Sequence, residues 1–178
     1  MFLAEARETG VSWNGFEHNR LLMNIDGHRF IDTGFLMGVA IELDSRMVVS
    51  SDFDADGRPD LLVSTREFST VSTSRRRTSR IWLKRNTLSH DRHWIGIRLA
   101  GPRSPIGARI AVVSGDREQL HYVVTGDGYL SQQPPARVFG LGDRTAVDYV
   151  LVTYPGGREV RIEAPPVDRY HVISDSSS

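Results

Sequence analysis

Four aspartates crowd into nine residues of this chain, which read Asp-Phe-Asp-Ala-Asp-Gly-Arg-Pro-Asp. They stand at positions 1, 3, 5 and 9 of the segment, as Asp52, Asp54, Asp56 and Asp60, with Gly57 at position 6. Carboxylates that converge on one point repel each other. A hard divalent cation removes that repulsion because it takes their oxygens as ligands. The spacing therefore predicts a calcium loop.

This segment, residues 52–60, is called the acidic loop below. It is not an EF-hand, because position 12 is Val63 in place of the closing glutamate and no helical pattern flanks it. The predicted calcium ligands are the four carboxylates and, at position 7, the backbone carbonyl of Arg58. The apolar run 61–63 predicts a strand directly after the loop. A solvated acidic turn without an ion is the alternative.

Composition limits the functional classes. Lysine plus arginine and aspartate plus glutamate both total 22, so the net charge is zero. A neutral chain argues against a dedicated nucleic-acid or membrane-surface binder. The absence of cysteine excludes disulfides, thiol catalysis and zinc–thiolate sites. No apolar stretch is long enough to span a bilayer, and the first residues lack a signal-peptide pattern, which leaves a cytoplasmic location open.

Short β-rich runs separated by turn residues predict an all-β protein. In the first half, the turn Asp26-Gly27 between two apolar runs predicts a hairpin. The segment Glu67–Arg80 is rich in Ser, Thr and Arg and lacks apolar periodicity, so we expect a loop. It could be a basic patch for an anionic partner, but a solvated linker is the favoured interpretation. The strands expected in this half are 21–24, 28–32, 47–50, 61–64 and 81–83.

The second half alternates apolar and polar residues more regularly, which predicts an antiparallel β-sandwich of seven strands. A polar tail, 174–178, follows it. The seven expected strands are 94–99, 108–113, 120–124, 138–141, 147–154, 159–162 and 169–173.

Three other groups of residues could do chemistry, and each has a structural alternative that we favour. The run His90–His93 could be a metal site or an acid–base pair, but no third ligand stands at a recognisable spacing, and a polar turn between strands is the favoured interpretation. The segment Gly126–Gln132 contains Ser131 but no nucleophile elbow, and its glycines predict a tight turn with Tyr129 and Leu130 packed inward. The tryptophans are expected to pack in sheets, although Trp13 lies in a turn-rich stretch. No catalytic residue is predicted.

Two resemblances cover the chain from about Asn19 to Ile173. The run from Ser50 to Val63 resembles the FG-GAP (VCBS-type) repeat of β-propeller blades, and Asn19–Asp32 and Ile81–Asn86 resemble the segments that join such blades. The second half resembles the ASPIC/UnbV domain of bacterial relatives of cartilage acidic protein. That resemblance is carried by His93–Leu99, Pro105–Ile110, Gly126–Gln132, Phe139–Gly142 and Tyr154–Arg158.

The resemblances imply a single propeller-like blade or small sheet over residues 1–86, with calcium loop 52–60, followed by an ASPIC/UnbV-like sandwich over 87–173. They imply Ca²⁺ binding, a periplasmic or extracellular location, and a non-catalytic module for protein–protein interaction. Such a module would be an accessory subunit of a larger assembly, because one blade leaves sheet edges uncovered. The alternative is an accessory domain or enzyme that acts on a natural product or polysaccharide. Carbohydrate binding by exposed aromatic side chains is a third possibility.

Overall fold

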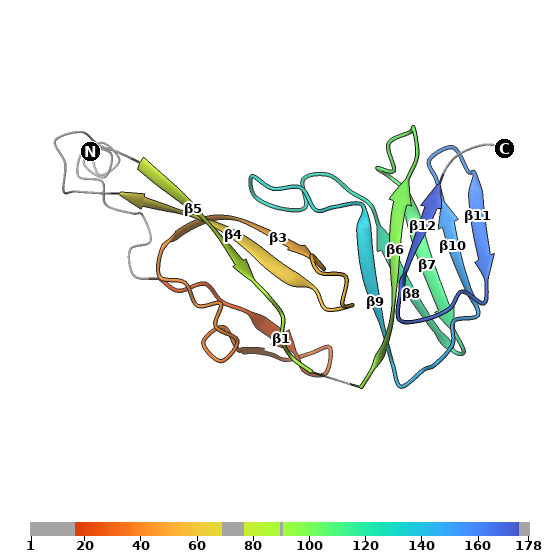
Figure 1. The fold of residues 1–178 in the computed structure, drawn as a ribbon, viewed down its shortest axis with the longest axis horizontal. Helices are drawn as coiled ribbons and strands as arrows, with labels where there is room; N and C mark the ends of the chain where they lie inside the picture. Colours follow the sequence, from red (N-terminus) through yellow and green to blue (C-terminus); the bar gives the residue numbers. More distant parts are fainter. Residues whose placement is uncertain (1–16, 69–76, 90, 175–178) are drawn as a thin grey trace. The chain divides into compact units, whose positions relative to one another are not determined.

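The computed structural model describes residues 17–68, 77–89 and 91–174, where all regular structure is β (Figure 1). The predicted all-β fold class is thus confirmed. The described strands are β1 (Leu22–Asn24), β2 (Phe30–Asp32), β3 (Asp44–Ser51), β4 (Asp60–Phe68), β5 (Arg77–Lys84), β6 (His93–Ala100), β7 (Arg109–Ser114), β8 (Arg117–Tyr122), β9 (Ala136–Gly142), β10 (Tyr149–Thr153), β11 (Glu159–Glu163) and β12 (Tyr170–Ser174).

The chain forms two compact units whose sequences interleave. Unit 1 comprises Met1–Val48 and Leu61–Lys84, and unit 2 comprises Val49–Asp60 and Arg85–Ser178. The acidic loop therefore belongs to the compact unit that contains the second half of the chain. The boundary predicted between residues 86 and 87 separates two family resemblances and not two compact units. It stays a prediction.

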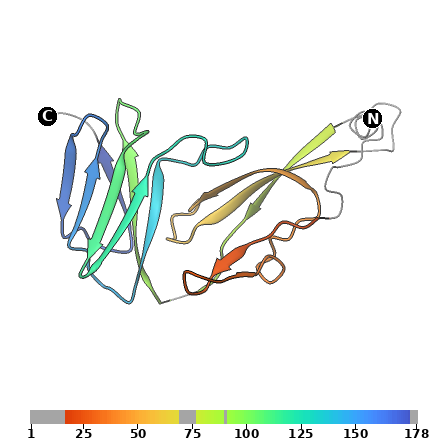
Figure 2. The same ribbon diagram turned by 180° about the vertical axis from the view of Figure 1, so that it is seen from behind.

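Unit 2 is a β-sandwich, and all seven strands predicted for it are present. One sheet has the order β11-β10-β7-β8 and the other the order β12-β6-β9. Figure 1 shows the three-stranded sheet with β6 at its centre, and Figure 2 shows the four-stranded sheet from behind. The apolar residues of the alternating pattern meet between the sheets in one cluster: Ile95, Ile97, Leu99, Ala108, Ile110, Val112, Val123, Phe139, Leu141, Val147, Val150, Val152, Tyr154 and Ile173.

One strand pair of the sandwich corrects the sequence prediction, which expected an antiparallel fold throughout. Strand β12 runs parallel to β6, with Tyr170 opposite Gly96 and Ile173 opposite Leu99. The reason is that β11 and β12 belong to different sheets. The chain between them crosses from one sheet to the other and enters beside β6 in the same direction, which no local pattern encodes.

Unit 1 contains the predicted hairpin and most of a three-stranded sheet. Strands β1 and β2 pair antiparallel around the Asp26-Gly27 turn, where Gly27 has a φ of 82°. The Asp26 carboxylate accepts hydrogen bonds from the amides of His28 and Arg29 and so holds the turn. The second sheet has the order β3-β4-β5.

The prediction of a loop over Glu67–Arg80 is wrong at both ends of this segment, which belong to strands. Strand β4 continues to Phe68 and β5 begins at Arg77, so these two residues face each other in an antiparallel pair. Backbone hydrogen bonds extend a hairpin whatever the polarity of its side chains, which is why the missing apolar period was misleading. Residues 69–76 lie outside the described part of the chain, as do Trp13, His90 and residues 175–178 of the tail. No helix in the described part is long and apolar enough to cross a membrane.

We predict that Ile97→Ala destabilises the sandwich strongly. Ile97 lies at the centre of β6 with no exposed surface, so truncation leaves a cavity between the sheets and lowers the free energy of unfolding by about 2–5 kcal/mol. The measurement is urea unfolding followed by tryptophan fluorescence. Val172→Ala, on the neighbouring strand and 63% exposed, is the control and should change stability by less than about 0.5 kcal/mol. Equal effects of the two substitutions would contradict the assigned core.

Candidate metal centre in the acidic loop

The acidic loop connects β3 to β4 and turns sharply at two residues with positive φ. Gly57 has a φ of 85°, a conformation that glycine adopts without steric cost, and Ala55 has a φ of 60°. Asp52 stands directly after β3 and Asp60 is the first residue of β4. The two strand ends thus fix the first and last carboxylates of the loop.

Three of the predicted carboxylates converge. One oxygen each from Asp52, Asp54 and Asp60 lies within 4.8 Å of the others. Oxygens that share a calcium ion at about 2.3–2.6 Å are at most about 5 Å apart, so this spacing suits one ion. Asp52 is 8% exposed and Asp60 is 2% exposed, whereas Asp54 lies at the surface. The donor set consists of hard oxygens only, which favours calcium or magnesium over zinc or copper.

The two buried carboxylates are held by neighbouring donors. Asp52 accepts hydrogen bonds from the amides of Asp56 at 3.1 Å and Gly57 at 2.7 Å. Asp60 accepts one from the amide of Phe53 at 3.1 Å and one from that of Asn86 at 2.7 Å. Buried polar groups need such partners, and these bonds fix the direction in which each carboxylate points.

The fourth predicted carboxylate is engaged elsewhere in this structure. Asp56 accepts a hydrogen bond from the Arg58 amide at 2.9 Å and forms an ion pair with the Arg58 guanidinium. Burial opposes its ionisation, but the bonds and charge of Arg58, together with the charge of Arg85, lower the pKa of Asp56. Arg58 thus contributes its side chain to the loop, and a metal ligand role for its carbonyl stays a prediction.

Arg85 supplies a positive charge at the open side of the cluster. Its Nε lies 2.6 Å from an Asp54 oxygen, and its Nη2 lies 3.9 Å from Asp56. The guanidinium neutralises part of the charge that a cation would neutralise. A bound ion and the Arg85 side chain would therefore compete for Asp54.

Two aromatic side chains of the sandwich pack against the acidic loop. The Tyr170 hydroxyl donates to Asp52 at 2.8 Å, and burial together with this carboxylate raises the pKa of Tyr170, so the hydroxyl stays protonated. The Trp94 ring lies against Gly57, where a Cβ would be 2.2 Å from it. The two rings contact each other edge to face, with centroids 5.3 Å apart.

Tyr170, Trp94 and Arg85 are neighbours of the loop that the sequence pattern alone did not predict. A usable signal existed for Arg85, because β5 pairs with β4 and places Leu61 opposite Lys84, next to the loop's end. No local signal existed for Tyr170, which follows Asp52 by 118 residues.

The other candidate groups have structural partners. His93 Nδ1 lies 2.7 Å from Asp168, and this interaction is the main reason that the pKa of Asp168 is lowered. Asp168 also bonds the backbone of Trp94 through both its carboxylate and its amide, so it joins the start of β6 to the turn before β12.

The segment Gly126–Gln132 forms the predicted tight turn, but Tyr129 and Leu130, which were predicted to pack inward, are exposed. Gly128 and Ser131 form an isolated bridge, which leaves Tyr129 and Leu130 as the two central residues of the turn. They are 70% and 65% exposed, because side chains at the tip of a tight turn project away from the strands.

We predict that Gly57→Ala destabilises unit 2 more than Gly156→Ala does. Both glycines have similar positive φ values, 85° and 93°, so both substitutions carry the same backbone cost. Only the Cβ at residue 57 would meet the Trp94 ring, since nothing lies within 4 Å of a Cβ at residue 156. Thermal unfolding of the two variants measures the difference. An equal drop in melting temperature would show that Trp94 does not pack on the loop.

Comparison with known proteins gives a match for part of the chain. No curated protein matches the chain. The model of the family described as ASPIC and UnbV matches residues 99–178, which run from the end of β6 through β12. This match confirms the ASPIC/UnbV resemblance for that part of the sandwich.

Proposed function

We propose that this chain is a non-catalytic, calcium-stabilised β module that makes protein–protein contacts as an accessory or structural subunit of a larger assembly. The observation that carries the proposal is the convergence of three carboxylates, two of them buried, in a loop packed against the sandwich. The resemblance of the acidic loop to an FG-GAP repeat supports calcium as the ion. The resemblance to an exported family supports a periplasmic or extracellular location, where calcium is abundant.

In this proposal Asp52, Asp54 and Asp60 hold the ion. Calcium supplies positive charge at the point where the three carboxylates meet, and it adds no redox or hydrolytic step. Asp54 would exchange its bond to Arg85 for the ion, whereas Asp52 and Asp60 are already directed by backbone amides. Because the site requires the folded loop, the free energy of ion binding adds to that of folding.

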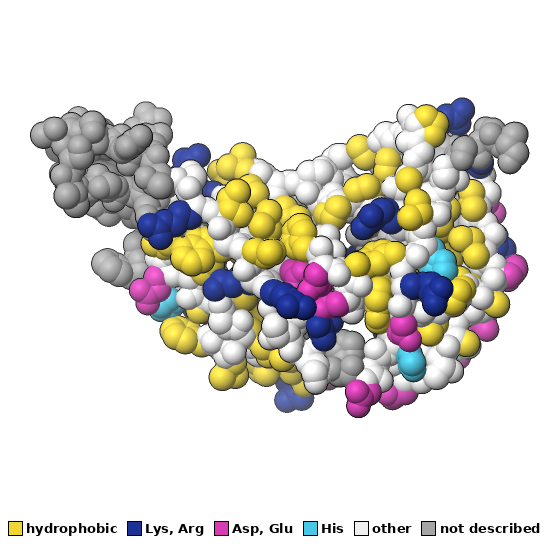
Figure 3. Space-filling model, viewed as in Figure 1, with side chains coloured by type: hydrophobic (Ala, Val, Ile, Leu, Met, Phe, Trp, Pro, Cys, Tyr) yellow, Lys and Arg dark blue, Asp and Glu magenta, His cyan; other side chains and the backbone are white. Residues whose placement is uncertain are grey.

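The proposed contact surface lies on the β3-β4-β5 sheet of unit 1. Hydrophobic side chains gather over this sheet in Figure 3. Ile81 and Leu83 alternate along β5 and share one face, with exposures of 69% and 57%. Strand β5 has β4 as its one neighbour within the described sheet, so the other edge offers backbone groups to a partner. An exposed apolar sheet face of this kind is typical of a protein contact site.

We predict that calcium raises the melting temperature of the wild-type protein and not that of Asp54→Asn. At about 100 times its Kd, an ion that binds only the folded state adds about 2.7 kcal/mol of stability. Asp54 is exposed and its ion pair with Arg85 is a surface pair, so the variant should keep its metal-free stability within about 1 kcal/mol. The measurement is thermal unfolding in calcium and in chelator.

The control for this experiment is Asp127→Asn, which removes an exposed carboxylate of unit 2 outside the acidic loop. It should retain the full calcium response. Identical melting of the wild-type protein in calcium and in chelator would refute the calcium part of the proposal.

We predict that Ile81→Ser combined with Leu83→Ser weakens binding to the protein that co-purifies with the tagged chain from its native cells. Truncation of central contact residues commonly costs about 2 kcal/mol or more, a loss of more than tenfold in affinity. The measurement is titration of the purified partner against each variant. Val172→Ser, which is similarly exposed but lies in unit 2, should bind as wild type does. A protein that stays monomeric at high concentration and retains no partner would contradict the proposed role.

A further inference from the structure

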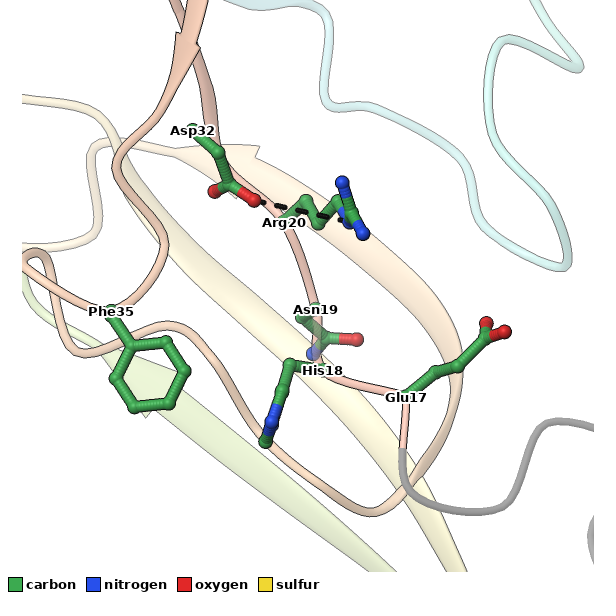
Figure 4. A pocket seen from close by; sticks show the side chains of 6 residues that line it. All are labelled: Glu17, His18, Asn19, Arg20, Asp32 and Phe35. Atoms are coloured by element: carbon green, nitrogen blue, oxygen red, sulfur yellow. Dashed lines mark ion pairs between the residues drawn. The ribbon is translucent and has the colours of Figure 1, made fainter.

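A cavity of about 490 Å³ opens in unit 1 beside the β1–β2 hairpin. Its volume lies within the range of about 300–1,000 Å³ that is typical of small-molecule sites. The lining residues within the described part of the chain belong to the stretch 17–35 of unit 1. Figure 4 shows the six side chains around it: Glu17, His18, Asn19, Arg20, Asp32 and Phe35.

Hydrogen bonds hold the backbone around the cavity. Thr33 bonds the Leu21 carbonyl through both its amide, at 2.8 Å, and its hydroxyl, at 3.1 Å. The Asp32 carboxylate accepts a bond from the Gly34 amide at 2.9 Å. Gly34 packs so closely that a Cβ there would lie 2.9 Å from the Asn19 carbonyl oxygen. The ligand-facing side chains therefore extend from a backbone that these bonds hold in place.

The polar side chains of the cavity suit hydroxyl groups. Glu17 and Asp32 offer carboxylate oxygens that accept hydrogen bonds, and the Asn19 amide can both donate and accept. The Arg20 guanidinium lies 3.9 Å from Asp32, which places donors and acceptors next to each other. Alternating donors and acceptors of this kind match vicinal hydroxyls, each of which donates one bond and accepts others.

One large aromatic side chain borders the same cavity. Phe35 is 76% exposed, so its ring contributes little to a core. The His18 ring approaches it edge to face, with centroids 5.1 Å apart. The exposed ring offers an apolar surface beside the polar groups, which suits a ligand with one apolar face and several hydroxyls.

We propose that this cavity binds a neutral saccharide unit. Its hydroxyls bond to Glu17, Asn19 and Asp32, and its C–H face packs on the Phe35 ring. Charge favours this class over an anion, because the described lining residues include two carboxylates, and Arg20 is already paired with Asp32. The site is separate from the acidic loop and does not depend on the function proposed above.

The test uses the full chain and a panel of glucose, galactose, mannose and N-acetylglucosamine, followed by saturation-transfer NMR and calorimetric titration. At least one sugar should bind the wild-type protein. Phe35→Ala should weaken its binding about tenfold by removing the aromatic surface. Leu36→Ala is the matched control, since Leu36 is an adjacent apolar residue, 86% exposed, that does not line the cavity. Circular dichroism of both variants verifies that they fold.

A second variant separates a sugar from a cation. Glu17→Gln keeps the shape of the side chain and its acceptor oxygen while it removes the charge, so sugar binding should persist in weakened form. Tetramethylammonium is the cationic probe. The proposal is overturned if no sugar of the panel binds, if Phe35→Ala binds as wild type does, or if tetramethylammonium displaces the sugar and Glu17→Gln abolishes all binding.

Discussion

The packing of Trp94 and Tyr170 on the acidic loop is the constraint on which the arrangement of unit 2 depends. The Trp94 ring occupies the space that any side chain at residue 57 would need. The Tyr170 hydroxyl donates a hydrogen bond to the buried Asp52 carboxylate. The loop thus keeps its carboxylates together while it forms part of the sandwich unit. Three donors, the amides of Asp56 and Gly57 and the Tyr170 hydroxyl, fix the direction of the Asp52 carboxylate, and a cation site requires ligands that are directed in this way.

The same two aromatic residues depend on close packing elsewhere in the sandwich. Tyr170 lies over Gly96, where a Cβ would be 2.4 Å from its ring, and Arg98 stacks on it with 5.5 Å to the centroid. The backbone of Trp94 is bonded to Asp168, which His93 in turn contacts. The parallel entry of β12 beside β6 makes these contacts possible, because it brings Tyr170 opposite Gly96. Sheet topology and loop geometry are therefore linked through a few side chains.

Unit 1 is organised differently. Its apolar residues are largely at the surface, for example Phe30 at 58% and Ile81 at 69% exposure, and Val39, Ile41 and Val63 are its buried apolar residues within the described part of the chain. Its turns are held by side-chain-to-backbone bonds such as those of Asp26. A unit with few buried apolar side chains in its described part would gain stability from any molecule that covered its exposed faces.

The amino-acid sequence alone was enough to predict the strands of the sandwich and three carboxylates that converge. Alternation of apolar residues is a local property, so it located every strand of the sandwich, and the spacing of Asp52, Asp54 and Asp60 brought their oxygens to one point. The parallel pairing of β12 with β6 and the ion pair between Asp56 and Arg58 became apparent only in the tertiary structure. The same holds for the exposure of Tyr129 and for the packing of Tyr170 and Trp94 on the acidic loop. The physical reason is that strand pairing and side-chain contacts depend on distances between residues far apart in the chain, and no local periodicity encodes them.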